Sequence, residues 1–174
     1  MKLTTKVILM MGALSMAACT NAGKLGGGAG DGAFDPNAAE NSGVIMGSVS
    51  DPTSNAYFQQ AVGDRVMFEV DQSSLTAVGR ATLDSQATWL LTNADYTAII
   101  EGHADEQGTR EYNIALGNRR ADAARSYLVS KGVPSSRMQI VSYGKERPIE
   151  ICSEEACYAK NRRAVTVLAG GLTG

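Results

Sequence analysis

The sequence has a single histidine and lacks the residue sets on which most metal and catalytic sites depend. His103 is that histidine, and the three cysteines form no pair of CxxC motifs. A structural zinc site needs about four such ligands. Hydrolytic catalysis needs a nucleophile, a metal or a suitably spaced pair of carboxylates around one pocket. We therefore expect no metal and no cofactor, and an enzyme built on His103, Asp105 and Glu106 is the weakest functional hypothesis.

Excess positive charge is also missing. Lys and Arg together number 16 against 18 Asp and Glu, which gives a formal net charge of -2. The chain has no Lys/Arg-rich run and no aromatic platform, so the usual electrostatic attraction to nucleic acid is absent. With 44% hydrophobic and 20% charged residues among 174, the composition is that of a globular protein with one core. We expect no nucleic-acid partner.

The N-terminus carries an apolar run, Val7 to Leu14, behind a start that contains two lysines. This pattern is typical of a secretory signal over residues 1–18, and the run is too short to span a bilayer comfortably. The ending Met-Ala-Ala before Cys19 resembles a bacterial lipobox, with Met16 in place of the usual Leu. In that motif the cysteine is lipidated and becomes the first mature residue. The alternative is an ordinary signal peptide with an incidental cysteine.

Lipidation of Cys19 would determine where the protein resides. Each buried CH2 contributes about 0.8 kcal/mol, so several acyl chains, palmitate among them, would form a firm anchor. Thr20 follows the cysteine where inner-membrane retention typically uses Asp. The lipobox resemblance therefore implies an outer-membrane, lipid-anchored protein on the periplasmic side.

Residues 19–55 are rich in Gly, Ala and Asn and lack the apolar periodicity that burial requires. We predict a flexible tether here, with a relaxed end-to-end distance of roughly 30–35 Å. The alternative is an unstructured terminus that does not serve as a tether. The folded domain is then expected over residues 56–170.

The folded domain is predicted to alternate strands with helices. Strands are expected at 65–70, 98–103, 138–144 and 163–168, two long helices at 76–93 and 109–131, and short helical turns at 56–62 and near the last two cysteines. Leu83, Ala87, Leu90 and Leu91 are expected to share the core face of the first long helix. Gly132 and Pro134 end the second long helix. This order predicts an α+β two-layer sandwich, in which a small mixed four-stranded sheet has helices on one face.

Cys152 and Cys157 flank four residues near the C-terminus. In an oxidising periplasm the default is a local disulfide that pins a loop or short helix. Free thiols or a metal site are the alternatives, and the metal site would need further ligands.

Two charged residues occupy positions where charge is costly unless a ligand or partner needs it. Asp105 follows the end of a predicted strand. Arg120 falls on the inward face of the second long helix, close to the direction of Leu116 at 100° per residue. An ammonium could donate to Asp105, while Arg120 could clamp a carboxylate with two parallel N–H groups. We expect the pair to hold the two ends of an amino-acid-like group.

Structural interpretations of the same residues stay open. Asp105 could satisfy the amides of its own turn. Arg120 could pair with a buried acid such as Glu101 or Asp105. His103, without a second ligand or a nucleophile, is expected to be structural. The Arg pairs 119–120 and 162–163 are interpreted as surface and strand-end charges. Arg162 is a further candidate for the cleft of Asp105 and Arg120.

Three motifs, EGHADEQGTREYNIALGNRRADAARSYLVSKGV, SYGKERP and NRRAVTV, resemble the OmpA-like peptidoglycan-binding domain. The resemblance covers about Arg65 to Leu168, and the lipobox and tether extend it to the lipid-anchored members of that family. It implies a non-catalytic outer-membrane lipoprotein that anchors the membrane to the cell wall through diaminopimelate of peptidoglycan stem peptides.

The resemblance also assigns residues to the diaminopimelate site. It places the D-centre of meso-diaminopimelate between Asp105 and Arg120. Weaker contacts are implied in the loop after the first strand and at the start of the second long helix: Asp71, Ser73, Asn113 and Leu116. The family pattern resembling VYFDFD appears here as VMFEVD, so Glu69 and Val70 depart from it. The cysteine pair is likewise not a general family feature.

The same resemblance implies protein partners. Lipid-anchored members of the family take part in the Tol system of cell division and envelope integrity. They bind TolB through a surface that overlaps the wall-binding pocket, and TolA is a further candidate. An interaction module with peptidoglycan binding secondary is therefore the main alternative function, and a cell-wall hydrolase is the least favoured.

Overall fold

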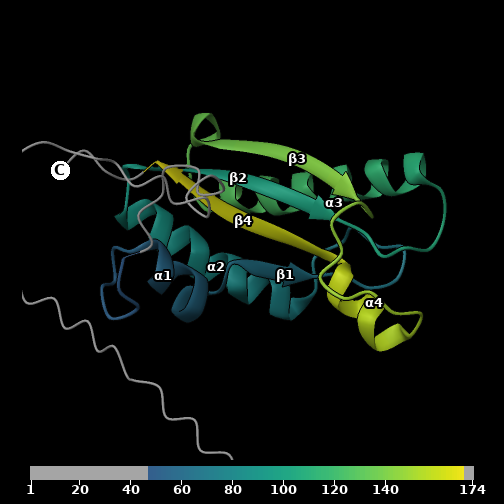
Figure 1. The fold of residues 1–174 in the computed structure, drawn as a ribbon. Helices are drawn as coiled ribbons and strands as arrows, with labels where there is room; N and C mark the ends of the chain where they lie inside the picture. The colour runs from purple at the N-terminus through teal and green to yellow at the C-terminus, as the bar shows by residue number, and fades with distance from the viewer. Residues whose placement is uncertain (1–46, 171–174) are drawn as a thin grey trace, which may run out of the picture. The chain divides into compact units, whose positions relative to one another are not determined.

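The computed structural model describes residues 47–170, and these residues form one sheet with its helices (Figure 1). The elements in chain order are α1 (Asn55–Tyr57), the π-helical segment η2 (Phe58–Gly63), β1 (Arg65–Met67), α2 (Ala77–Thr92), β2 (Tyr96–His103), α3 (Arg110–Ser130), the 3-10 turn η3 (Ser135–Arg137), β3 (Met138–Gly144), α4 (Glu155–Asn161) and β4 (Arg163–Gly170). The signal, Cys19 and most of the predicted tether lie outside the described residues. No helix between residues 47 and 170 is long and apolar enough to cross a membrane.

The sheet has the order β1-β4-β2-β3 and is mixed. β4 runs antiparallel to both of its neighbours, whereas β2 and β3 are parallel. Ala98 fixes the register, since it lies opposite Leu168 on one side and Met138 on the other. The predicted α+β fold with a small four-stranded mixed sheet is confirmed.

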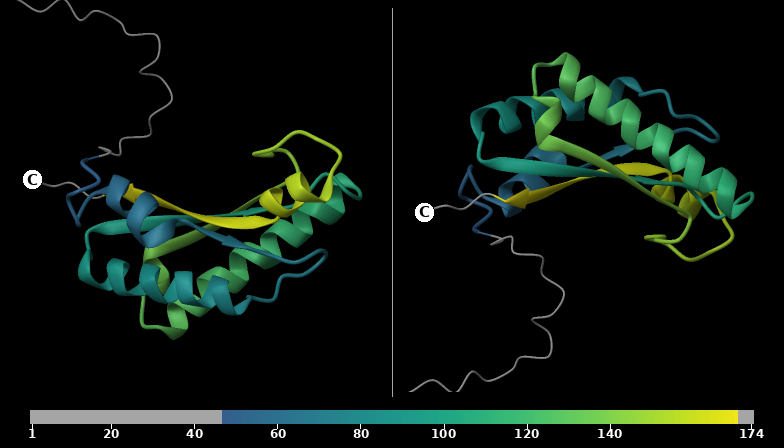
Figure 2. Two further views of the ribbon diagram at one scale, coloured as in Figure 1. Left: turned by 90° about the horizontal axis from the view of Figure 1, so that it is seen from below. Right: turned by 90° about the horizontal axis from the view of Figure 1, so that it is seen from above.

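Helices α2 and α3 cover the same face of the sheet (Figure 2). Each begins at a threonine whose side chain accepts a backbone N–H: Thr76 from Gly79 at 3.0 Å and Thr109 from Tyr112 at 3.2 Å. Such caps satisfy amides that the first helical turn leaves free. The core between helices and sheet contains Leu83, Leu90, Ile100, Leu128 and Leu168. Burial of this apolar face is the main stabilising contribution.

β2 and α3 approach each other through their backbones. A Cβ added to Gly102 would lie 1.8 Å from the carbonyl oxygen of Gly117. Glycine is therefore required at position 102, and the close contact fixes where α3 crosses the sheet. That crossing brings the N-terminal end of α3 beside the C-terminal end of β2, where the predicted ligand residues lie.

Two details of the fold differ from the predictions. β1 ends at Met67 instead of Val70, because the chain turns away toward Asp71, whose φ is +56°. Leu91, predicted on the core face of α2, is 48% exposed, whereas Trp89 is only 6% exposed and belongs to the core. The Trp89 Nε1 donates to the Pro52 carbonyl at 2.7 Å, so contacts with α2 extend the folded part upstream of residue 56.

Candidate functional site

A pocket of about 290 Å³ lies at the C-terminal end of β2, beside the start of α3. Its lining residues come from the loop after β1, the turn after β2 and the first turns of α3: Val70, Asp71, Asp105, Gln107, Gly108, Tyr112, Asn113 and Leu116. Four of the six residues predicted for the ligand site, Asp71, Asp105, Asn113 and Leu116, line this one pocket. Ser73 and Arg120 do not line it.

Asp105 is 8% exposed and makes two defined contacts. Its Oδ1 accepts the backbone N–H of Gln107 at 3.2 Å, the turn bond expected from the structural interpretation. Its Oδ2 accepts from Nη1 of Arg162 at 3.1 Å. The carboxylate is therefore fixed in direction and partly neutralised while it faces the pocket.

Arg162, expected as a strand-end charge and a further candidate for the same cleft, pairs with Asp105 but does not itself line the pocket. Besides Asp105, its guanidinium reaches the Phe68 carbonyl through Nε at 3.2 Å and Glu155 Oε1 through Nη2. Burial lowers the pKa of Arg162, but the hydrogen bonds to Glu155 and Asp105 outweigh this effect and the net pKa is raised. Arg162 thus stays charged beside Asp105. The signal available in the sequence was only the NRR motif before β4.

Arg120 is fully buried behind the pocket wall. Its three nitrogens donate to three backbone carbonyls: Nε to Gln72 at 2.8 Å, Nη1 to His103 at 2.8 Å and Nη2 to Glu69 at 3.1 Å. It therefore ties the loop after β1 to the end of β2. Neither Glu101 nor Asp105, the acids considered as its partners, accepts a hydrogen bond from it.

Burial lowers the pKa of Arg120 to about 10, although the charges of Asp105 and Asp71 oppose this shift. At neutral pH the guanidinium is still protonated. The ring centroid of Phe68 lies 5.3 Å from its central carbon, within the range of a cation–π contact. A positive charge therefore lies behind a pocket wall that carries two carboxylates, Asp71 and Asp105.

Tyr112 completes the opposite side of the pocket, and sequence reasoning did not assign it to the site. Its hydroxyl donates to Asp71 Oδ1, and this hydrogen bond raises the pKa of Tyr112. The contact joins the loop after β1 to α3 across the pocket mouth. Asp71 and Tyr112 are 41 residues apart, so no local pattern could have indicated the pairing.

The floor of the pocket is built by the turn between β2 and α3. Asn113 is almost fully buried, and its Nδ2 donates to the Gln107 carbonyl at 2.8 Å. Lys145 Nζ donates to the Gly108 carbonyl at 2.7 Å from the loop after β3. Leu116 adds an apolar surface. The pocket thus offers two carboxylates, buried cations behind them and one apolar wall.

His103 is buried and has a structural position. Its Nε2 lies 3.4 Å from Glu101 Oε2, and burial lowers its pKa against the opposing effect of Glu101. Its side chain does not line the pocket. Within residues 47–170, no group of three or more His, Cys, Asp and Glu side chains is arranged to hold a metal ion.

A larger hollow of about 500 Å³ lies between β1, the start of α2 and α4. It contains none of the six predicted ligand residues. Its lining is mainly the edge strand and apolar side chains such as Val66, Met67 and Val78. The smaller pocket remains the candidate site because the acidic and amide side chains converge there.

Comparison with known proteins identifies close relatives. The OmpA family model matches residues 67–162. The chain is 53% identical over 135 residues to the peptidoglycan-associated lipoprotein of Rhizobium meliloti, covering 78% of this chain and 76% of the relative. It is 46% identical over 164 residues to that of Agrobacterium fabrum, covering 94% and 87%.

Solved structures agree on the fold. The peptidoglycan-associated lipoprotein from Burkholderia pseudomallei is 38% identical, with a TM-score of 0.61, and the match covers 69% of this chain and 98% of that one. The C-terminal domain of Helicobacter pylori MotB matches at 18% identity with a TM-score of 0.58, covering 62% of this chain and 85% of that one. At that identity the likeness concerns the fold alone.

Proposed function

The chain belongs to the OmpA family, and we propose that it is a lipoprotein that joins the outer membrane to the cell wall by holding diaminopimelate of a peptidoglycan stem peptide in the 290 Å³ pocket. The family is one of peptidoglycan-binding proteins without catalytic activity, and the chain is not an enzyme. Its relatives are named as lipoproteins associated with peptidoglycan, which supports a place in the outer-membrane envelope.

The observation that carries the proposal is the placement of Asp105. Its carboxylate faces the pocket, fixed by Arg162 and the Gln107 amide, with Arg120 behind the same wall. The free D-centre of diaminopimelate is a zwitterion with an ammonium beside a carboxylate. The ammonium can donate to Asp105, and the buried guanidinium favours the carboxylate through its charge.

A direct hydrogen bond from Arg120 to the ligand requires a free N–H group on the guanidinium and access to it from the pocket. Each nitrogen already donates to one carbonyl, so only the second hydrogens of Nη1 and Nη2 remain for a carboxylate. Val70 and Asp71 line the pocket, whereas Arg120 does not, and it binds the carbonyls of Glu69 and Gln72 on either side of them in the chain. We propose that a ligand reaches Arg120 when residues 69–72 shift, and that Asp71, Ser73, Asn113 and Leu116 then surround it.

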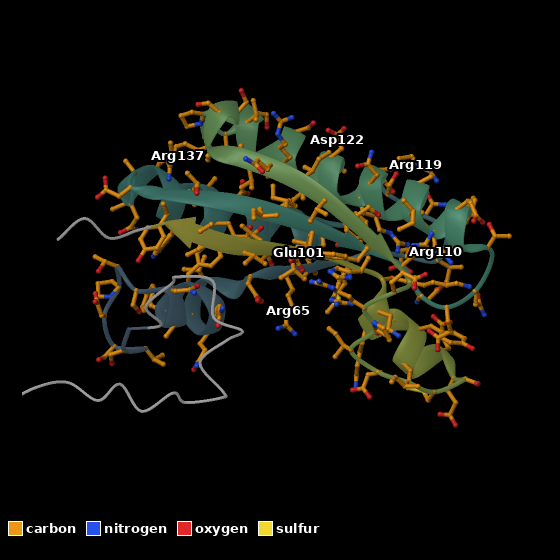
Figure 3. All side chains as sticks on the ribbon, turned by 45° about the horizontal axis from the view of Figure 1, so that its top comes forward. Arg65, Glu101, Arg110, Arg119, Asp122 and Arg137 are labelled. Atoms are coloured by element: carbon orange, nitrogen blue, oxygen red, sulfur yellow. A yellow bond between two sulfur atoms is a disulfide. The ribbon has the colours of Figure 1, made fainter. Side chains whose placement is uncertain are left out.

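The test is retention on purified peptidoglycan sacculi for the wild type and two matched variants. Asp105→Asn keeps the size of the side chain but removes the charge that receives the ammonium. Asp122→Asn removes a charge from the exposed face of α3, where the side chain points away from the sheet (Figure 3).

We expect Asp105→Asn to weaken retention by at least about tenfold, in line with the loss of one partner of a desolvated charge pair. Asp122→Asn should be retained like the wild type. Unfolding midpoints must be measured for all three proteins, so that a binding loss is not confused with unfolding. Equal retention of the three folded proteins would exclude Asp105 from the site.

We also propose TolB, with TolA as a further candidate, as a protein partner that competes for the same surface. Val70 and Tyr112, which are 51% and 43% exposed, lie at the pocket and offer apolar area for a protein contact. Purified TolB added to chain-loaded sacculi should release the chain as its concentration rises. Retention that stays constant at saturating TolB would show that the two surfaces are separate.

A further inference from the structure

The disulfide between Cys152 and Cys157 closes a short loop. The side chain of Arg162 connects this loop to Asp105 in the pocket wall. Glu155 lies inside this loop, at the first residue of α4. Its Oε1 accepts from Nη2 of Arg162, and Nη1 of the same guanidinium donates to Asp105 at 3.1 Å. An unbroken series of contacts therefore leads from the disulfide loop to the pocket carboxylate.

The segment before α4 has few other attachments. Ile151 is 89% exposed, and within residues 47–170 no hydrogen bond of Ile151, Cys152 or Ser153 joins them to another part of the chain. The preceding residues are held by Asn161, whose Oδ1 accepts the backbone N–H of Ile149 at 2.8 Å and of Glu150 at 3.1 Å. Between Glu150 and α4, the disulfide is therefore the cross-link that fixes the path of the described chain.

Glu155 is largely exposed, so its ion pair with Arg162 depends on a fixed backbone, which the disulfide supplies. Its side chain is 66% exposed, while that of Arg162 is 4% exposed. An exposed carboxylate ordinarily gains little from an ion pair, because ordering it costs side-chain entropy and water screens the charge. A backbone fixed by a short covalent loop lowers that entropic cost. Glu155 can then keep its place beside a buried guanidinium.

We infer that Glu155 is a positioning residue of the pocket, held by the Cys152–Cys157 loop and acting through Arg162 on Asp105. The inference rests on the proposed function. It identifies a control on ligand binding that lies outside the pocket lining.

Loss of Glu155 would weaken binding for two reasons that act in the same direction. First, Arg162 would lose one of its three fixed acceptors, so Asp105 would be held less firmly for the ligand. Second, the positive charge of Arg162 would no longer be shared with Glu155. Its full effect on Asp105 would make the carboxylate less attractive to a ligand ammonium.

Opening the disulfide should have the same effect as loss of Glu155. Dithiothreitol supplies two electrons and two protons, the S–S bond breaks to give two thiols, and the reagent is oxidised to its cyclic disulfide. Glu155 remains in the sequence, but the loop that presents it is released. Binding by this chain therefore becomes sensitive to a dithiol reductant.

The experiment measures the affinity of the full-length chain for the tripeptide L-Ala-γ-D-Glu-meso-diaminopimelate. Four proteins are compared with and without dithiothreitol: the wild type, Glu155→Gln, Glu154→Gln and the double variant Cys152→Ser/Cys157→Ser. Glu154 is the matched control, since it is the adjacent exposed acid and its side chain caps nothing. Thermal unfolding of each protein is recorded in parallel.

We expect Glu155→Gln to raise the Kd by roughly fivefold, a typical size for coupling through a contact network. Reduction of the wild type, and the double cysteine variant, should give a similar rise, while Glu154→Gln should bind like the wild type. Reduction of Glu155→Gln should add almost nothing to its Kd, although it should lower the unfolding temperature as it does in the wild type. A purely structural disulfide would instead weaken both proteins to the same degree.

The outcomes separate the inference from the proposed function. Wild-type affinity in Glu155→Gln, an equal loss in Glu154→Gln, or a further loss when Glu155→Gln is reduced would each overturn the positioning role. A wild type that does not bind the tripeptide in either redox state would overturn the proposed function itself, and the inference with it.

Discussion

Arg120 shows how one residue can be both costly and necessary. A guanidinium with no exposed surface gives up its hydration, and the lowered pKa of about 10 records that loss. Three carbonyl oxygens replace the lost water. They belong to Glu69, Gln72 and His103, so the residue joins the loop after β1 to the end of β2 behind the pocket.

Replacement of Arg120 by lysine should reveal this role. A lysine keeps the charge but has one nitrogen, which cannot reach three carbonyls that lie in different directions. We expect Arg120→Lys to lower the free energy of unfolding by about 3 kcal/mol, since buried carbonyls lose partners and a buried charge is less well solvated. Urea unfolding at neutral pH measures the difference.

Arg119→Lys is the matched control for that measurement. Arg119 is the preceding residue, and its side chain points away from the sheet (Figure 3). A substitution at such a surface position should change stability by less than about 0.5 kcal/mol. Similar unfolding curves for the two lysine variants would contradict the view that Arg120 organises the pocket loops.

The sequence predicted the inward direction of Arg120 but not its acceptors. Helical periodicity is local, so Leu116 and Arg120 could be placed on one face from spacing alone. The carbonyls that Arg120 binds at Glu69 and Gln72 are about 50 residues upstream, and they point inward only because β1 ends early. The Asp105–Arg162 pair, 57 residues apart, was likewise beyond any local pattern.

At the scale of elements, the two long helices were the most predictable parts. Thr76 and Thr109 signal helix starts through local chemistry, and both caps are present. β1 was predicted three residues too long because the alternation of Val66, Phe68 and Val70 continues past the last sheet pair. The strand ends there for two reasons. The Glu69 carbonyl accepts a hydrogen bond from Arg120, and Asp71 adopts a positive φ that turns the backbone.

The contact between β2 and α3 gives a prediction about glycine. Gly102→Ala would place a methyl group against the Gly117 backbone, which cannot rotate away as a side chain could. We expect a loss of about 3 kcal/mol or more in the free energy of unfolding, because the helix must shift off the sheet. Thermal and urea unfolding measure this loss.

Gly79→Ala is the control for the element prediction. Gly79 lies in α2, and the nearest atom to an added Cβ is Thr76 Oγ1 at 3.3 Å, a tight contact from which this side-chain hydroxyl must shift by a few tenths of an ångström. Alanine favours helix by up to about 1 kcal/mol over glycine, which offsets the cost of that shift. This variant should therefore be close to the wild type in stability. A Gly102→Ala protein as stable as Gly79→Ala would mean that the backbone contact is not required.

At the scale of the whole molecule, the prediction concerns the proposed anchor at Cys19. Residues 1–19 can be replaced by a signal peptide that ends in an ordinary cleavage site. The pocket is unchanged, so binding to purified sacculi should equal that of the wild type. The chain should move from the membrane fraction to the soluble fraction of the envelope, because the acyl chains are lost. Membrane retention of this lipid-free form would contradict the proposed anchoring.

The position of the pocket relative to the start of the described chain has a mechanical consequence. Thr53 and Pro52 attach near the beginning of β2, through Tyr96 and Trp89, whereas Asp105 follows its end. A domain held from its N-terminal side and by a ligand at the pocket is stretched along β2. The covalent backbone of β2 then carries the tension between these two points, and the hydrogen bonds to a neighbour on both sides keep the strand in the sheet. In the proposed anchoring role, tension between membrane and wall would therefore run along a central strand of the sheet.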